Sequence, residues 1–166
     1  MKTKILLLIS LSVAFFQCST EAEITKSPIW GVDYSAESTT GFAEGSIEQQ
    51  TDGPKVIYIV SSGALREVEE NSYTVSFTFE NGGSLQLGIL KKTADYNYQF
   101  PGNESGNQLV SATFNGNALD LTESSISIQP DLGDNKLHII TKMHTLNAGD
   151  FNGMLSRIPL LKKATS

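Results

Sequence analysis

Two histidines lie near the end of the chain, and histidine is the side chain whose charge changes most readily near neutral pH. His138 and His144 are six residues apart in a stretch that alternates apolar and polar residues. On an extended strand this separation spans about 20 Å, and both rings lie on the same face. A bound metal ion needs its ligands about 2 Å away. The spacing therefore argues against a shared metal, and we interpret both rings as surface or half-buried histidines.

Acidic residues form two short clusters with the oxygen atoms that metal binding or acid–base catalysis would use. Residues 131–135 place two carboxylates and an amide in a turn, and calcium prefers such ligands. The spacing lacks the further acidic ligands of a calcium-binding loop, and Asp and Gly are also ordinary turn formers. Glu67, Glu69 and Glu70 would suit a glycosidase carboxylate pair, although a run of charges is usually a solvated face. We predict no metal site and no cofactor.

Serine is abundant, but nucleophilic catalysis needs the hydroxyl to be held against a base. The sequence contains no G-x-S-x-G nucleophile motif, and the strand pattern described below does not predict the α/β fold that carries that motif. We therefore predict that the protein is not an enzyme.

Aromatic residues offer the other candidate chemistry, which is stacking on sugar rings. Tyr96, Tyr98 and Phe100 alternate, so on a strand their rings would line one face. The alternative is that these rings fill the core beneath a neighbouring strand. Trp30, the only tryptophan, is a further candidate for a binding platform. Exposed rings at Trp30, Tyr96 and Tyr98 would favour ligand binding, and buried rings would favour a structural role.

The start of the chain has the composition of an export signal. Lys2 and Lys4 form a basic head, and residues 5–16 are an apolar run interrupted by two serines. The run is too short to span a membrane as a helix, which takes about 20 apolar residues. Cys18, the only cysteine, follows. A lone cysteine in this place is suited to lipid attachment, and the alternative is an ordinary secretory leader in which it is incidental.

Residues 1–20 resemble a bacterial lipoprotein signal peptide of the Bacteroidetes type, with Gln17 where a small residue is usual and Ser19 after the cysteine. The resemblance implies that the Cys18 thiol is diacylated and that the leader is cut before it. Glu21 and Glu23 resemble the acidic stretch that helps such lipoproteins reach the outer cell surface. The rest of the chain is similar to small β-rich lipoproteins of these bacteria, and that similarity implies no functional residue.

The charge balance excludes some partners. The chain carries a net charge of −6. The leader holds two of its 12 basic residues and none of its 18 acidic ones, so the remainder has a net charge of −8. Nucleic-acid binding needs a basic face, and anionic lipid headgroups also attract basic residues. We therefore expect no nucleic-acid partner, and we expect membrane contact only through lipid on Cys18.

Apolar residues at every second position predict strands along most of the chain. Residues 72–79 place Tyr73, Val75 and Phe77 on one face, and the turn signal at Asn81 predicts a hairpin with a returning strand over 84–91. Residues 61–71 suit one or two helical turns instead. Further strands are predicted over residues 28–34, 56–60, 96–100, 108–114, 118–121, 124–129, 136–145 and 151–161.

Many short strands separated by turns predict an all-β protein, as an antiparallel β-sandwich with few or no helices. A small β-barrel is the alternative. We divide the chain into a signal peptide (1–17), a lipidated cysteine with its tether (18–27) and a single domain (28–166).

Together these features predict a lipid-anchored lipoprotein of the outer membrane, on its periplasmic or extracellular side, with a non-enzymatic structural or accessory role. An envelope protein would be its partner. The alternative is a module that binds a glycan or another small ligand through an aromatic strand face made by Trp30, Tyr96 and Tyr98.

Overall fold

A computed structural model describes residues 25–35 and 40–163. The predicted leader, Cys18 and most of the predicted tether lie outside the described residues. Within the described ranges the secondary structure consists of strands, turns and bends, and none of these residues is helical. The prediction of an all-β protein is confirmed for this part of the chain.

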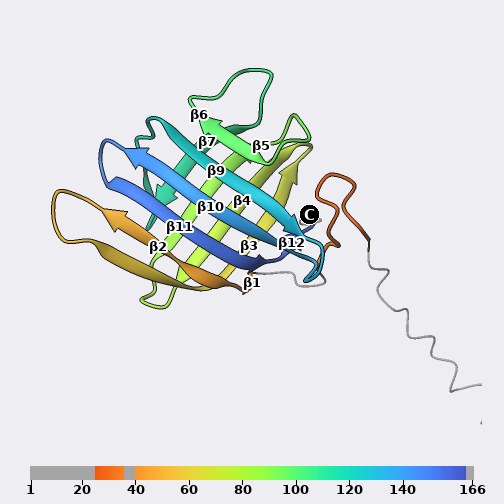
Figure 1. The fold of residues 1–166 in the computed structure, drawn as a ribbon, viewed down its shortest axis with the longest axis horizontal. Helices are drawn as coiled ribbons and strands as arrows, with labels where there is room; N and C mark the ends of the chain where they lie inside the picture. Colours follow the sequence, from red (N-terminus) through yellow and green to blue (C-terminus); the bar gives the residue numbers. More distant parts are fainter. Residues whose placement is uncertain (1–24, 36–39, 164–166) are drawn as a thin grey trace, which may run out of the picture.

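Twelve strands follow one another along the described chain (Figure 1). They are β1 (Gly41–Phe42), β2 (Glu44–Gln50), β3 (Val56–Glu69), β4 (Ser72–Phe79), β5 (Ser84–Leu90), β6 (Asn97–Phe100), β7 (Gln108–Phe114), β8 (Asn117–Ala118), β9 (Ser124–Asp131), β10 (Lys136–Thr145), β11 (Gly149–Ile158) and β12 (Leu160–Leu161).

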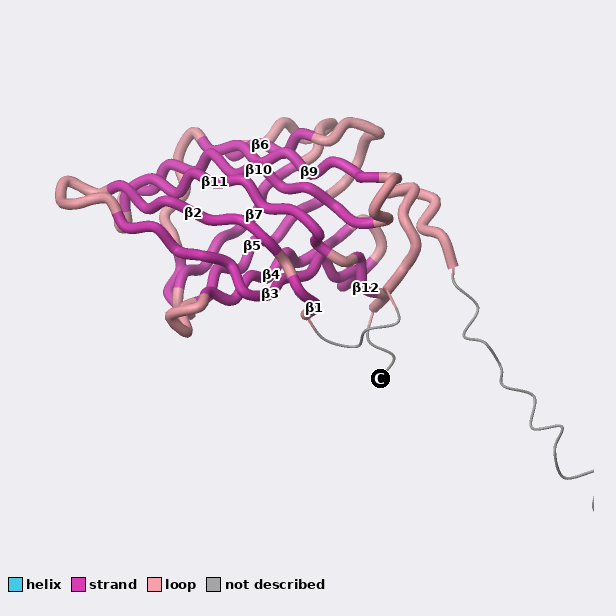
Figure 2. Tube along the Cα trace, turned by 60° about the horizontal axis from the view of Figure 1, so that its bottom comes forward, coloured by secondary structure: helices cyan, strands magenta, loops and turns pink. Residues whose placement is uncertain are grey.

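Nine of these strands close into a barrel, in the order β3-β2-β11-β10-β9-β6-β7-β5-β4 and back to β3 (Figures 1 and 2). The predicted sandwich is therefore wrong, and the alternative of a small barrel is correct. The reason lies in β3, which has 14 residues. Its first part pairs with β2, from Val56 to Ile59, and its second part pairs with β4, from Val60 to Glu69. One long strand with partners on both sides joins the two ends of the sheet.

The same strand corrects the helical prediction for residues 61–71. Leu65 and Val68 suit a helical turn by their spacing, but Leu65 is fully buried and pairs with Val75, whereas Val68 is exposed. The parallel strand β12 covers β3 from the other side at Leu65. Pairing on both sides outweighs the local helical pattern.

Side chains at every second position of the strands point inward and form the interior of the barrel. The predicted hairpin is confirmed: β4 pairs with β5, and Val75 lies opposite Leu87 and Phe77 opposite Leu85. All four side chains are buried. The turn between the strands has Gly82 in the left-handed region, with φ of 84°, a conformation that glycine adopts without steric cost. Every strand of the closed barrel contributes side chains to a single buried core.

Residues 25–34, which we call the N-terminal plug, close one end of the barrel, beside β12 and the C-terminal end of the described chain (Figure 1). The plug was predicted to contain a strand over 28–34, but it folds as turns held by isolated bridges from Lys26 to Asp33 and from Tyr34 to Leu160. Packed structure begins slightly before Pro28, because Ser27 is already buried.

The opposite end is filled by rings. Tyr58, Phe79, Phe114 and Phe151 form a chain of neighbouring aromatic rings whose centroids are 5.1 to 6.3 Å apart. Offset or edge-on ring pairs at these distances add to the free energy gained by burying their area.

The alternation in β4 predicts how two neighbouring substitutions differ. Phe77→Ala should lower the free energy of unfolding by about 3–5 kcal/mol, because it leaves a cavity in the core. Thr78→Ala, at an exposed position on the outer face, should change it by less than about 0.5 kcal/mol. Urea denaturation of both variants measures the difference, and equal small losses would remove β4 from the core.

Candidate functional site

The three aromatic residues singled out as ligand-binding candidates meet around one lysine at the plugged end of the barrel. The Lys91 ammonium lies 4.6 Å from the ring centroid of Trp30, 5.2 Å from that of Tyr96 and 5.8 Å from that of Tyr98. Cations within about 6 Å of a ring face are attracted to it. We call these four residues the Lys91 cage.

The rings of the cage come from different parts of the fold. Trp30 belongs to the plug, Tyr98 to β6, and Tyr96 to the loop just before β6. Trp30 also packs edge-on against Tyr73 of β4, with ring centroids 5.5 Å apart, and is stacked on Tyr98 at 6.4 Å. Trp30 thus packs the plug against both β4 and β6.

Asn107 fixes the loop that carries the lysine. Its side-chain oxygen accepts hydrogen bonds from the backbone N–H groups of Lys92 (2.7 Å) and Thr93 (2.9 Å), and its Nδ2 donates to the Asp95 carbonyl (2.6 Å). The Lys91 ammonium donates to the same carbonyl at 2.9 Å. Asn107 is only 5% exposed, and sequence reasoning missed it because its partners lie 12 to 15 residues away.

Burial decides what the cage can do. Trp30 is 1% exposed, Tyr98 is fully buried, and Tyr96 is 39% exposed. Trp30, Tyr96 and Tyr98 therefore do not form a row of solvent-facing rings, since of these three only Tyr96 offers part of its ring to solvent. Lys91 itself is 4% exposed. Burial lowers the pKa of the Lys91 ammonium, and the nearby Asp95 carboxylate partly opposes that shift.

Polar atoms with no hydrogen-bond partner among the described residues accompany the cage. They are Trp30 Nε1, Tyr73 OH and Tyr98 OH, with Thr141 Oγ1 elsewhere in the interior. Burial, aided by the nearby Glu67 carboxylate, raises the pKa of Tyr73 to about 12. Burial also raises the pKa of Tyr98.

These shifts predict how stability depends on alkaline pH. Between pH 10 and about 12 the folded chain keeps the Tyr73 proton that the unfolded chain loses. The unfolded chain then binds fewer protons, so the free energy of unfolding must fall as pH rises through this window. The lowered pKa of Lys91 acts in the opposite direction, since the unfolded chain holds that proton up to about pH 10.5. Denaturation at several pH values should show a shallower fall for Tyr73→Phe, and parallel curves would contradict the assignment.

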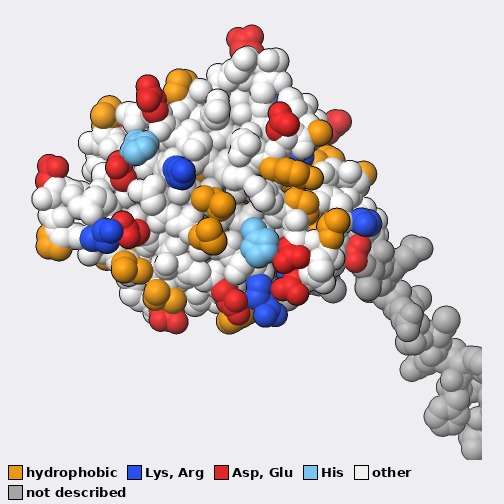
Figure 3. Space-filling view, viewed as in Figure 1, with side chains coloured by type: hydrophobic (Ala, Val, Ile, Leu, Met, Phe, Trp, Pro, Cys, Tyr) orange, Lys and Arg blue, Asp and Glu red, His pale blue; other side chains and the backbone are white. Residues whose placement is uncertain are grey.

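The two histidines lie apart on the outer face of β10 (Figure 3), as their shared parity predicts. Each has its own aspartate: His138 Nε2 lies 2.9 Å from Asp131, and His144 Nδ1 lies 2.9 Å from Asp150. Their side chains are 43% and 50% exposed. Both pairs are therefore solvated, and exposed ion pairs contribute little to stability.

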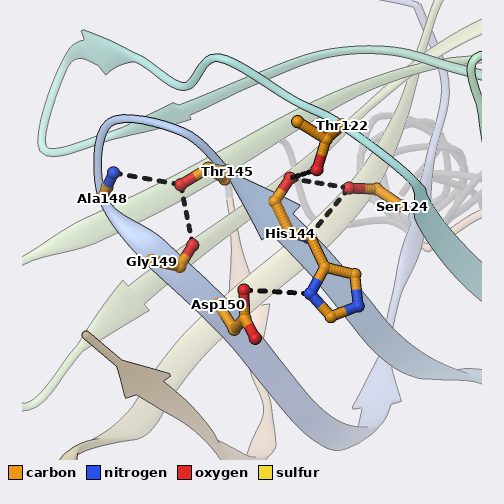
Figure 4. A network of polar contacts seen from close by, with 7 residues as sticks. All are labelled: Thr122, Ser124, His144, Thr145, Ala148, Gly149 and Asp150. Atoms are coloured by element: carbon orange, nitrogen blue, oxygen red, sulfur yellow. Dashed lines mark hydrogen bonds and ion pairs between the residues drawn. The ribbon is translucent and has the colours of Figure 1, made fainter. Parts of the chain in front are cut away.

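Figure 4 shows that Ser124 and Asp150 both contact His144, but the three residues do not form a catalytic triad. The Ser124 hydroxyl accepts from the backbone N–H of His144 at 2.9 Å and donates to its carbonyl at 3.1 Å. Thr122 donates to the same carbonyl at 3.2 Å. A triad requires the hydroxyl to bond to the ring. Ser124 instead ties the start of β9 to the end of β10.

The acidic cluster at residues 131–135 is engaged in structural contacts. The Asp131 carboxylate accepts hydrogen bonds from His138 (2.9 Å) and from the backbone N–H groups of Gly133 (2.9 Å) and Asp134 (3.3 Å). These bonds, with that to His138 the largest, lower the pKa of Asp131. Residues 131–135 therefore form a turn capped by a side chain. In the described chain no group of three or more acidic, histidine or cysteine side chains has the geometry of a metal site.

The three glutamates at and after the end of β3 have different surroundings. Glu67 accepts a hydrogen bond from the Tyr34 hydroxyl of the plug at 2.9 Å. Glu69 is exposed at the last position of β3, and Glu70 is exposed in the following turn. Glu67 thus makes a second contact between the plug and the barrel, in addition to the contact made by Trp30.

The capped turn predicts that metal chelation has no effect. Adding EDTA or calcium to the purified protein should leave its thermal midpoint unchanged, because Asp131 already has hydrogen-bond donors. A clear fall of the midpoint in EDTA, restored by calcium, would show that residues 131–135 bind the ion.

Comparisons with known proteins found no matching family model, curated protein or solved structure. Among the described residues, no helix has the length and apolar character to cross a membrane.

Proposed function

We propose that this protein is a lipid-anchored barrel of the bacterial outer membrane, attached through Cys18, with a non-enzymatic structural or accessory role toward other envelope components. The observation that carries the proposal is the position of the plug. Residue 25, where the described structure begins, lies at the plugged end of the barrel (Figure 1). Cys18 is seven residues earlier.

The short separation limits how far the barrel can stand from its anchor. Seven extended residues reach at most about 25 Å. A lipid on Cys18 would therefore hold the plugged end toward the membrane surface, and the opposite end, with the hairpin between β10 and β11, would face away. The plug joins the anchor to the core through Trp30, so the barrel would be held by a packed segment and a short tether.

The contacts of the candidate catalytic groups support a non-enzymatic role. Ser124 bonds to backbone, Asp131 caps a turn, and Glu67 receives the Tyr34 hydroxyl. These three groups therefore already serve the fold. An acidic domain of this kind stays soluble at a crowded surface.

The alternative role, glycan binding through an aromatic face, has weaker support. Stacking on a sugar needs rings that solvent can reach, and Trp30 and Tyr98 are buried while Tyr96 is partly exposed. Tyr96 alone would contribute one ring, whereas flat sugar platforms use several. The structural or accessory role is therefore the function that we propose.

The anchor is tested by replacing the cysteine. Cells expressing the wild-type chain or Thr20→Ala should incorporate labelled palmitate and hold the protein in the membrane fraction. Cys18→Ser should do neither, because two or more acyl chains are what make membrane attachment stable. Wild-type protein without label, or a Cys18→Ser variant that stays in the membrane fraction, would contradict the proposal.

A further inference from the structure

Apolar side chains are exposed on the outer surface of the plug. Pro28 and Ile29 lie in a turn, which is closed by a hydrogen bond of 2.9 Å from the Gly31 N–H to the Ser27 carbonyl. Trp30, the next residue of this turn, is 1% exposed, whereas Ile29 is 39% exposed and Pro28 is exposed as well. The turn therefore buries its tryptophan in the barrel and leaves two apolar side chains in solvent.

A leucine from the loop between β9 and β10 extends this apolar surface. Leu132 is 68% exposed, and its Cδ2 lies 3.8 Å from the position that a Cβ would take on Gly31. The loop is held to the plug, because the Asn135 side-chain oxygen accepts a hydrogen bond from the backbone N–H of Asp33 at 2.8 Å. Two segments far apart in the sequence thus form one surface. We call its exposed residues the apolar tip: Pro28, Ile29 and Leu132.

The apolar tip lies where the chain toward Cys18 leaves the barrel. The plug and the loop between β9 and β10 are at the same end of the molecule (Figure 1). The described structure begins at residue 25, three residues before Pro28, and seven extended residues toward Cys18 reach at most about 25 Å. Single exposed apolar residues are normal on a protein surface. Those of the tip differ in lying side by side at the end that a lipid on Cys18 would bring to a bilayer.

The charges at the two ends of the barrel favour the same orientation. The loops between β2 and β3, β4 and β5, and β8 and β9 lie at the end opposite the plug, and their exposed charged residues are mostly acidic: Asp52, Lys55, Glu80, Asp120 and Glu123. The segments at the plugged end expose lysines as well as acids: Lys26, Lys92, Lys162 and Lys163 beside Glu70, Asp95, Glu104 and Asp134. Anionic headgroups repel carboxylates and attract lysines, so the plugged end approaches a membrane at lower cost.

We propose that the apolar tip inserts into the interfacial layer of the lipid bilayer that carries the anchor, and that it fixes the plugged end against the membrane. The inference rests on the proposed anchor, because membrane binding scales with buried apolar area and three side chains bury little. It revises the expectation that the membrane is contacted only through lipid on Cys18. The acyl chains hold the protein on the membrane, and the tip sets the orientation of the barrel.

The test places an environment-sensitive fluorophore at each end of the full lipidated chain, reconstituted in vesicles of phosphatidylethanolamine and phosphatidylglycerol. Leu132→Cys and Leu146→Cys each add one reactive thiol, because the sulfur of Cys18 is acylated. Leu146, 81% exposed between β10 and β11, is the matched control. The fluorophore at position 132 should have blue-shifted emission. Spin-labelled lipids should quench it several-fold more strongly than the fluorophore at position 146.

A second pair of variants tests whether the residues of the tip act as one surface. Ile29→Glu should remove the blue shift of the fluorophore at position 132, because inserting a carboxylate beside it is costly. Val56→Glu should leave the blue shift unchanged, although Val56 is 43% exposed and so matches Ile29. Circular dichroism checks that each variant keeps its strands. A blue shift that Ile29→Glu does not reduce would overturn the inference.

Vesicle flotation distinguishes failure of the anchor from failure of the tip. If the wild-type chain does not float with the vesicles, the proposed anchor is wrong and the inference fails with it. If the chain floats but the fluorophores at positions 132 and 146 respond alike, the anchor stands and the tip does not insert. A Cys18→Ser protein with the fluorophore at position 132 should show no blue shift in buffer. A shift there that grows with protein concentration would assign the tip to a second copy of this chain and overturn the inference.

Discussion

The contact between Trp30 and Lys91 ties the N-terminal segment to the barrel, and the arrangement of the plugged end depends on it. The ammonium lies 4.6 Å from the indole centroid and is almost fully buried. A buried cation is costly unless it is paired or faces an aromatic ring. Here the rings of Trp30 and Tyr98 and the Asp95 carbonyl surround it. The plug and the cation therefore stabilise one another.

Period-two alternation in the sequence was enough to predict the hairpin of β4 and β5 and most other strands, because each has one buried face. It was not enough to distinguish a sandwich from a barrel. That depends on β3 having partners on both sides, and no local pattern encodes a partner. The helical prediction for residues 61–71 failed for the same reason, since Leu65 is buried by pairing with distant strands.

The sequence pointed to the three aromatic residues of the Lys91 cage by type, but not to the lysine or to the geometry that brings them together. Trp30, Tyr96 and Tyr98 stand out by type, and the structure brings all three together. Their common neighbour Lys91 was not singled out, because a lysine at the end of a strand is usually a solvated charge. Asn107 was not singled out either. Unless its hydrogen-bond partners are known, an asparagine that organises a loop looks the same in the sequence as one in a turn.

The plugged end is the part of the barrel that bears on the proposed anchor. The described chain begins at the plug, where a tether from Cys18 would arrive. The most direct test of the plug uses the fluorescence of Trp30, the only tryptophan. In the native full chain its emission should be blue-shifted and resist quenching by acrylamide until the barrel unfolds. Ready quenching under native conditions would show that the plug is not seated, and would contradict this account of the plugged end.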